Sequence, residues 1–321
     1  MDSIIEIKNL KKYFATPHGQ LHAVDRVSLS FERGKTIGVV GESGCGKSNL
    51  GRTIIHLLES TGGQIFYEGR DVTKVNARQL RELREHMQII FQDPYSSLDP
   101  RKNVENAISE PLIVSGRFRK NQIMDKTAQL METVGIDERL RHSYPHELDG
   151  GRRQRVGIAR ALALNPSFVV CDEPVSALDV SIQAQVLNLL KKLQQTQNIT
   201  YMFVTHDLSV VRHISDTICV MYLGQVVEYS PAREIFTNPL HPYTKALLSA
   251  IPSTDIDKPM KREILRGEIT SPINPKPGCR FAARCKYRCD KCTGELEFRE
   301  VSPGHYVSCC RVEEVKSAES H

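Results

Sequence analysis

The chain has 321 residues and a mass of 36.2 kDa, which is room for one large domain or two ordinary ones. Hydrophobic residues make up 40% and charged residues 25%, close to the globular average, and this excludes a wholly disordered, collagen-like or coiled-coil chain. The net charge of +5 is too small to indicate nucleic-acid binding, and no apolar run reaches the roughly 18 residues needed to span a bilayer.

The first part of the chain predicts antiparallel strands followed by a nucleotide-binding core. Residues 4–31 alternate apolar and polar positions in short runs, as antiparallel strands do. No basic stretch followed by an apolar core precedes them, so we expect no export signal, and spanning helices would have to come from another chain. A β-branched strand at 36–40, a glycine-rich turn and a helix at 50–58 follow, which is the start of an α/β nucleotide-binding core.

The middle of the chain predicts helices and then returns to strands. Apolar residues recur at three- and four-residue steps between about residues 94 and 166, which indicates a mostly helical insert. Short apolar runs at 168–171 and 201–204 predict buried parallel strands, and residues 180–197 predict a helix between them. Its expected inner face comprises Val186, Leu189, Leu190 and Leu193. Frequent prolines after about residue 231 predict an extended, loop-rich appendage.

The glycine-rich turn fits the phosphate-binding pattern G-x-x-x-x-G-K-[ST] in the strand–loop–helix context that this pattern requires. Glycines let the backbone N–H groups point at a phosphate, and the following helix directs its positive end toward the same anion. Lys47 would supply a point charge to the outer phosphates, and the Ser48 hydroxyl would be a ligand for Mg²⁺. The predicted loop residues are Gly41, Glu42, Ser43, Gly44, Cys45, Gly46, Lys47 and Ser48.

An acidic pair follows the predicted strand at 168–171. Asp172 is placed to hold Mg²⁺, directly or through water, and Glu173 to orient and deprotonate an attacking water. Alone, such a pair is as often a helix cap. Together with a phosphate loop in the same chain, it predicts phosphoryl transfer to water.

These motifs and their order over residues 9–207 resemble the ATP-binding subunits of ABC transporters. The resemblance implies that Gln92 senses Mg²⁺ and the lytic water, and that His206 contacts the γ-phosphate. It implies that Phe14 stacks on adenine, with Tyr13 as a close competitor. Asn49 stands where threonine is usual, and its amide is expected to reach the α-phosphate.

The resemblance also implies a dimer in which each subunit contacts the ATP of the other. The expected contacts are the signature residues and the interface loop: Asp149, Gly150, Gly151, Arg152 and Asp179. The family's signature is normally Leu-Ser-Gly-Gly-Gln, so Asp149 replaces a serine and brings negative charge against a phosphate. We therefore predict an asymmetric heterodimer, in which this chain's own loop hydrolyses ATP and the partner's loop, closed by Asp149, turns ATP over poorly.

Residues 83–95 and 238–244 narrow the resemblance to the second ATPase subunit of dipeptide/oligopeptide importers. This implies a companion ATPase subunit, two transmembrane permease subunits, an extracytoplasmic substrate-binding protein and a peripheral location at the cytoplasmic face of the cell membrane. Nickel, glutathione or oligosaccharide remain alternative cargoes within the branch. A soluble ABC ATPase acting on ribosomes or DNA is disfavoured, because such proteins usually carry two cassettes or a long coiled coil.

The implied fold class is α/β: an ABC-type P-loop NTPase core, in which a mixed sheet has an antiparallel β subdomain, with a helical insert and a C-terminal Cys-rich extension. We expect residues 1–93 to form the ATP-binding core with its antiparallel subdomain and 94–165 the helical signature subdomain. Residues 166–235 are expected to complete the core, and 236–321 to form the extension.

Six of the nine cysteines lie between Cys279 and Cys310, and without an export signal we expect a reducing compartment and a metal centre. Four soft thiolates select zinc or an iron–sulfur cluster, and Cys289-x-x-Cys292 is compatible with zinc. The branch resemblance implies a [4Fe–4S] cluster, with Cys289 and Cys310 as extras. Its implied ligands are Cys279, Cys285, Cys292 and Cys309. Neighbouring basic residues, including Arg280 and Arg284, are expected to favour the thiolate form.

Overall fold

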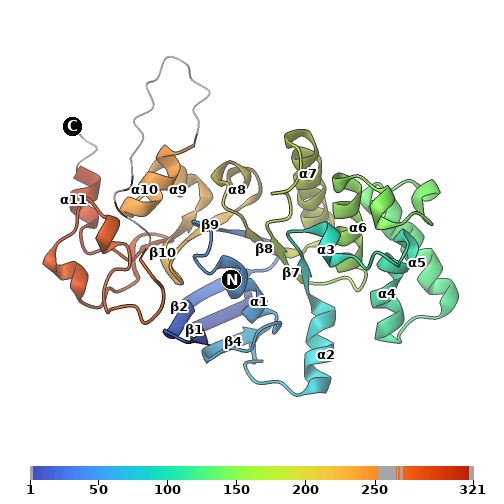
Figure 1. Ribbon diagram of the computed structural model, residues 1–321, viewed down its shortest axis with the longest axis horizontal. Helices are drawn as coiled ribbons and strands as arrows, with labels where there is room; N and C mark the ends of the chain where they lie inside the picture. Colours follow the sequence, from blue (N-terminus) through green and yellow to red (C-terminus); the bar gives the residue numbers. More distant parts are fainter. Residues whose placement is uncertain (1–2, 252–264, 266, 268–269, 318–321) are drawn as a thin grey trace, which may run out of the picture. The chain divides into compact units, whose positions relative to one another are not determined.

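The structure is a computed structural model that describes residues 3–251, 265, 267 and 270–317 (Figure 1). The chain divides into two compact units, each assembled from stretches that are not contiguous in the sequence. The first unit contains Phe31–Lys35 and Lys74–Val204. The second contains Ile5–Ser30, Thr36–Thr73 and the described chain from Thr205 onward. The four segment boundaries expected from the sequence stay a prediction.

The first unit contains parallel strands in the order β8–β7–β6. Their bounds are Met87–Ile90 for β6, Phe168–Asp172 for β7 and Thr200–Val204 for β8. Every side chain of β7 and β8 is buried, as in parallel strands that are covered on both faces. The strands predicted at 168–171 and 201–204 are therefore confirmed.

Helices fill much of the insert, as predicted. They are α3 (Pro94–Ser97), α4 (Val104–Ser115), α5 (Lys120–Val134) and α6 (Gly150–Leu162), with 3-10 turns at Glu138–Leu140 and Pro145–Glu147. Local sequence sets their ends, since the Asn103 side chain caps α4 by accepting a hydrogen bond from the Asn106 N–H. Gly116 and Gly135 end α4 and α5 in the left-handed conformation.

Two further helices complete the first unit. Helix α2 spans Ala77–His86, and α7 spans Val180–Gln197, the bounds predicted from the sequence. The inner face of α7 differs in one position, because Leu187 is buried and Leu189 is only half-buried. The face is therefore rotated slightly from the one that the apolar spacing predicts.

The second unit holds most of an antiparallel sheet in the order β2–β1–β4–β5. Its strands are β1 (Ser3–Thr16), β2 (Gly19–Glu32), β4 (Gly62–Tyr67) and β5 (Arg70–Asp71). The antiparallel strands predicted over residues 4–31 are confirmed. They form two strands of 14 residues each, rather than several short runs.

The other strands of the second unit carry the phosphate loop and the C-terminal hairpin. Strand β9 (Thr217–Tyr222) pairs in parallel with β3 (Thr36–Val40) and antiparallel with β10 (Gln225–Pro231). The hairpin of β11 (Arg299–Ser302) and β12 (His305–Val307) then pairs with β10. The extension is thereby hydrogen-bonded to the same sheet as the phosphate loop.

The helices of this unit are α1 (Lys47–Ile54), α8 (Leu208–Ile214), α9 (Ala232–Thr237), α10 (Pro242–Ser249) and α11 (Val312–Ser317), with 3-10 turns at Ala282–Arg284 and Asp290–Thr293. Helix α1 ends earlier than the predicted residue 58, and His56 follows with a φ of 56°. That left-handed residue cannot continue a right-handed helix.

The stretch after Pro231 is more regular than the loop-rich appendage that its prolines predict. Pro242 begins α10, where a missing N–H breaks no helical hydrogen bond. Pro252 and Pro259 lie outside the described residues. Over the part of the chain that the structure describes, no helix combines the length and apolar character needed to cross a membrane.

The predicted α/β fold class is confirmed by the mixed sheet, the antiparallel sheet and the helices described above.

Candidate nucleotide site and cysteine centre

The turn between β3 and α1 requires glycine at both of its ends. Gly41 has a φ of 152° and Gly46 a φ of 104°, in the region that favours glycine. A Cβ on Gly41 would lie 2.2 Å from the carbonyl oxygen of Met221, and one on Gly46 would lie 2.0 Å from that of Ala23. Neighbouring backbone therefore holds the loop tightly at the N-terminus of α1, the end of a helix at which backbone N–H groups can bind an anion.

Lys47 places its charge inside this loop. Its side chain is 5% exposed, and its ammonium donates to the carbonyl oxygens of Gly41 at 2.7 Å and Glu42 at 3.0 Å. A buried ammonium needs such partners to offset its desolvation. Ser48 and Asn49 are half-buried in the first turn of α1, and Ser43 and Gly44 are exposed at the tip of the loop. The loop thus presents one cation and several backbone donors at one place.

Two predicted catalytic residues meet in the first unit. Glu173 follows the buried Asp172 at the end of β7, and its carboxylate accepts a hydrogen bond from Gln92 Nε2 at 3.1 Å. The φ of Glu173 is 47°, which costs on the order of 1 kcal/mol or more for a residue with a side chain. The hydrogen bond from its N–H to the Val204 carbonyl, 2.9 Å long, helps to hold that conformation. Backbone strain of this kind clusters at functional sites.

His206, the third predicted catalytic residue, belongs to the second unit. It is exposed in the short turn before α8. The preceding Thr205 fixes this turn from both sides, because its N–H donates to the Val39 carbonyl at 3.2 Å and its hydroxyl accepts from the Asp207 N–H at 3.1 Å. The structure therefore presents the His206 imidazole on a turn that is tied to β3, the strand that leads into the phosphate loop.

The signature residues begin α6, and Asp149 is its N-cap. Asp149 Oδ1 accepts a hydrogen bond from the Arg152 N–H at 2.7 Å. A Cβ on Gly151 would lie 2.6 Å from Cγ2 of Ile182, so the two glycines let α6 approach the start of α7. Asp179 is exposed at the N-cap of α7. The structure thus brings the predicted partner-contacting residues together on one unit.

The two aromatic candidates for adenine stacking have different surroundings. Tyr13 stacks on the His22 ring with centroids 3.9 Å apart, and its hydroxyl donates to Asp25 at 2.5 Å. Burial and then this hydrogen bond raise the pKa of Tyr13. Phe14 is half-buried, and the Lys12 ammonium lies 4.7 Å from its ring centroid. Tyr13 is held by a stacked ring and a hydrogen bond, whereas the Phe14 ring lies against the Lys12 ammonium. Phe14 is therefore the better candidate for stacking on adenine.

The four predicted cluster ligands line one pocket in the extension. Its lining comprises Cys279, Cys285, Cys292, Cys309, Cys310, His241, Pro242, Phe281, Tyr287, Leu296 and Arg311. Burial, and then repulsion from neighbouring cysteines, raises the pKa of Cys279 to about 12. Four thiols that line one pocket are a donor set that fits a metal centre, and a bound cation would stabilise their thiolate forms.

Three cysteines of the extension, Cys289, Cys292 and Cys310, form a compact group. The Sγ atoms of Cys289 and Cys292 are 3.8 Å apart, and that of Cys310 lies 3.8 Å from the first and 3.6 Å from the second. A tetrahedron with metal–sulfur bonds of about 2.3 Å has sulfur–sulfur edges of about 3.8 Å. Cys289 and Cys310, which the resemblance implies are extras, are therefore spaced as zinc ligands are.

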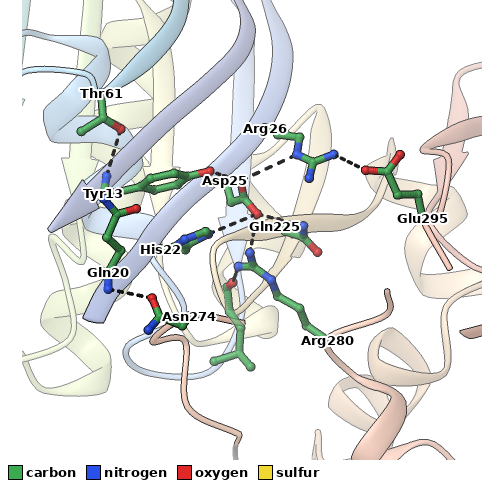
Figure 2. Close-up of polar contacts among 11 residues, drawn as sticks. Tyr13, Gln20, His22, Asp25, Arg26, Thr61, Gln225, Asn274, Arg280 and Glu295 are labelled. Carbon is green, nitrogen blue, oxygen red and sulfur yellow. Dashed lines mark hydrogen bonds and ion pairs between the residues drawn. The ribbon is translucent and has the colours of Figure 1, made fainter. Parts of the chain in front are cut away.

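Two arginines of the extension contact carboxylates rather than the thiolates expected from the sequence. Arg280 donates to Asp25 and to the Leu223 carbonyl, as Figure 2 shows for Asp25. Arg284 pairs with Glu42 of the phosphate loop, at 2.8 Å and 3.1 Å. These pairs were not predicted, because no sequence pattern connects positions more than 240 residues apart. The available sequence signal was an excess of basic residues between Cys279 and Cys292, where Asp290 is the single acid.

Comparisons with known proteins show the family to which the chain belongs. Residues 24–176 match the ABC transporter family, and residues 227–292 match the C-terminal region of oligopeptide/dipeptide transporters. The chain is 47% identical to the oligopeptide transport ATP-binding protein AppF of Bacillus subtilis, over 96% of this chain and 97% of that protein. It is also 47% identical to OppF of Salmonella typhimurium, over 96% of this chain and 93% of that protein.

Among solved structures, the chain is similar to the ATP-binding cassette MJ0796, a dimer bound to ADP and Pi in a post-hydrolysis state. The TM-score is 0.66 and the identity 28%, over 71% of this chain and 99% of that one. The chain therefore belongs to the ATP-binding proteins of ABC transporters, in the oligopeptide/dipeptide branch that carries the additional C-terminal region.

Proposed function

We propose that this chain hydrolyses ATP to power the import of di- or oligopeptides through an ABC transporter. The observation that carries the proposal is the phosphate loop, in which a buried Lys47 and glycines with positive φ lie together at the start of α1. The C-terminal region adds the substrate class, because it matches that of oligopeptide/dipeptide transporters. Nickel, glutathione or oligosaccharide import is the alternative, since the cargo site lies on other chains.

In the proposed reaction, the loop and Lys47 bind the phosphates of ATP while Phe14 stacks on adenine. Ser48, Asp172 and Gln92 would hold Mg²⁺, which neutralises charge on the phosphates when bound. Glu173 orients a water and accepts its proton as the γ-phosphoryl is transferred, and its contact with Gln92 keeps the carboxylate in place. His206 contacts the γ-phosphate. Positioning and charge stabilisation therefore supply the catalysis.

The proposed assembly is an asymmetric heterodimer on two membrane permease subunits, supplied by an extracytoplasmic binding protein. This chain would be peripheral, at the cytoplasmic face of the membrane. Asp149, Gly150, Gly151, Arg152 and Asp179 would face the ATP held by the companion ATPase. Asp149 is 58% exposed at its side chain, so its charge is available to repel that phosphate.

We further propose that the cysteine pocket holds a [4Fe–4S] cluster through Cys279, Cys285, Cys292 and Cys309, because all four line one pocket. A single zinc ion is the second candidate, favoured by the spacing of Cys289, Cys292 and Cys310. Either centre would supply positive charge that stabilises the thiolate forms of these largely half-buried cysteines.

Two experiments test these proposals. In the assembled transporter, Lys47→Ala is expected to abolish ATP turnover and peptide uptake together, and full turnover in this variant would refute the proposed site. For the centre, iron, acid-labile sulfide and zinc are measured in anaerobically purified wild type and in the Cys279→Ser and Cys289→Ser variants. Loss of iron and sulfide in Cys279→Ser alone supports the cluster, whereas zinc that is lost in Cys289→Ser supports the single ion.

A further inference from the structure

The short segment between Cys279 and Cys285 joins the cysteine pocket to the nucleotide site. Its backbone is a tight turn in which the Ala282 N–H donates to the Cys279 carbonyl at 3.0 Å and the Arg284 N–H to the Phe281 carbonyl at 2.9 Å. Phe281 is 1% exposed and packs edge-on against Tyr222, with ring centroids 5.3 Å apart. Each end of this turn is a cysteine that lines the pocket, so the position of the cysteines fixes the position of the turn.

Arg284 in this turn binds the phosphate loop directly. Its two terminal nitrogens contact the two carboxylate oxygens of Glu42, at 2.8 Å and 3.1 Å. The Arg284 side chain is 9% exposed and that of Glu42 26% exposed, so the pair is largely shielded from water. The hydrogen bonds to Glu42 raise the pKa of Arg284. A shielded, bidentate pair of this kind has both strength and a fixed geometry, unlike an exposed ion pair.

Glu42 in turn sets the shape of the loop. Its N–H donates to the Tyr243 hydroxyl at 2.8 Å, and its carbonyl accepts from Lys47 Nζ at 3.0 Å and from the Cys45 N–H at 3.2 Å. The side chain is therefore held by the extension, while the backbone of the same residue orients the lysine that is expected to meet the phosphates. A shift of Arg284 would be transmitted to Lys47 through one residue.

Arg280, at the other end of the turn, makes a second connection. It donates to Asp25, which also accepts from the Tyr13 hydroxyl at 2.5 Å and from Gln225 Nε2 at 3.2 Å (Figure 2). The side chains of Arg280 and Asp25 are 6% and 5% exposed. Tyr13 directly precedes Phe14, the proposed adenine contact. The turn is therefore anchored both near the phosphate loop and near the strand expected to hold the base.

We propose that Arg284 is a positioning residue for nucleotide binding, and that metal loading of the cysteine pocket and ATP binding at the loop strengthen each other through the Arg284–Glu42 pair. The inference rests on the proposed function, because it assumes that the loop binds ATP and the pocket a metal centre. A loaded pocket fixes Cys279 and Cys285, and with them the turn that carries Arg284. Linkage then requires bound nucleotide to favour the loaded pocket by the same factor.

The experiment measures the affinity of the full chain for Mg²⁺ with a non-hydrolysable ATP analogue, before and after a chelator removes the metal. We expect removal to weaken binding to wild type about tenfold, within the range usual for coupled sites. Arg284→Gln is expected to bind as weakly as stripped wild type whether loaded or not. The matched control is Arg78→Gln, which removes a pair with Glu82 on α2 that is exposed on both sides, and it should behave as wild type.

Two further measurements separate positioning from a loss of folding. Arg284→Lys keeps the positive charge but cannot make the bidentate contact with Glu42, so it should recover part of the nucleotide affinity. In steady-state ATPase assays, Arg284→Gln should raise KM for ATP more than it lowers kcat. The analogue should also increase retention of metal against the chelator in wild type, but not in Arg284→Gln. Equal affinity of loaded and stripped wild type overturns the inference and leaves the ATP site standing. Wild type that binds no nucleotide in either state overturns the proposed function as well.

Discussion

Asp149 caps helix α6 through the backbone N–H of Arg152, which donates to its Oδ1 at 2.7 Å, while Arg152 Nε lies 3.4 Å from its Oδ2. A serine at this position would also cap the helix, so the aspartate preserves the local structure. Its charge is favourable at the positive end of α6. The aspartate therefore does not destabilise this chain. The expected cost is repulsion between its charge and a phosphate bound by a partner subunit.

Replacing Asp149 tests this penalty. Asp149→Ser keeps an N-cap and removes the charge, so the stability of the chain should change by less than about 1 kcal/mol. The ATPase rate of the assembled transporter should rise by about twofold, because a second site becomes hydrolytic. Thermal unfolding and steady-state ATPase assays measure the two effects. Asp149→Asn, which also caps, should act in the same direction, and an unchanged rate in both variants would contradict the repulsion.

Glu173 is expected to carry proton abstraction in this chain's own site. Glu173→Gln should lower ATP turnover by about a hundredfold or more and leave ATP binding intact, because the amide orients water but cannot accept its proton. The same change at the companion's equivalent glutamate should cost much less if the dimer is asymmetric. Single-turnover hydrolysis and nucleotide binding, measured on both complexes, decide the question, and equal losses would refute the asymmetry.

The glycines of the phosphate loop differ in their tolerance of a side chain. Gly46→Ala should destabilise the chain by about 1–3 kcal/mol from backbone strain alone, with a further cost from the contact with Ala23. It should also weaken nucleotide binding. Gly44→Ala is the matched control, since an added Cβ there meets nothing within 4 Å although φ is 78°. Chemical denaturation and ATP titration should rank Gly46→Ala well below Gly44→Ala; equal effects would contradict the steric argument.

Asp25 contributes stability that depends on pH. Burial by itself raises the pKa of Asp25, but the hydrogen bond from Tyr13 and the charges of Arg280, His22 and Arg26 outweigh it, and the net pKa is lowered. A carboxyl with a lowered pKa stabilises the fold above its unfolded value, and this contribution is lost as the pH falls through the folded pKa.

The expected result is a difference between wild type and Asp25→Asn that varies with pH. At neutral pH the variant should be less stable by about 3–5 kcal/mol, because Arg280 is left buried without its partner charge. The difference should narrow as the pH falls below about 4, where the unfolded carboxyl binds a proton. Denaturant titrations at several pH values measure it, and a difference that stays constant down to acid pH would show that Asp25 acts through packing alone.

Local patterns in the sequence predicted most of the fold and indicated the candidate nucleotide residues. The phosphate loop, the parallel strands around it and α7 all follow from periodicity and spacing within a few residues, and the structure contains them. Where local cues compete, the prediction was weaker: α1 ends before His56, and Pro242 begins helix α10 within a stretch that its prolines predict to be loop. Turn geometry and capping settle such ends over one or two residues.

Only the tertiary structure decided how the extension meets the nucleotide site. Arg280 and Arg284 are adjacent in sequence to Cys279 and Cys285, and this proximity predicted that their charges would stabilise the thiolates. Folding instead brings Asp25 and Glu42 within hydrogen-bond distance of Arg280 and Arg284. The compact spacing of Cys289 with Cys310 has the same origin. Pairings between residues so far apart in sequence form only when the extension folds back onto the sheet, as the pairing of β12 with β10 shows. No local sequence pattern encodes them.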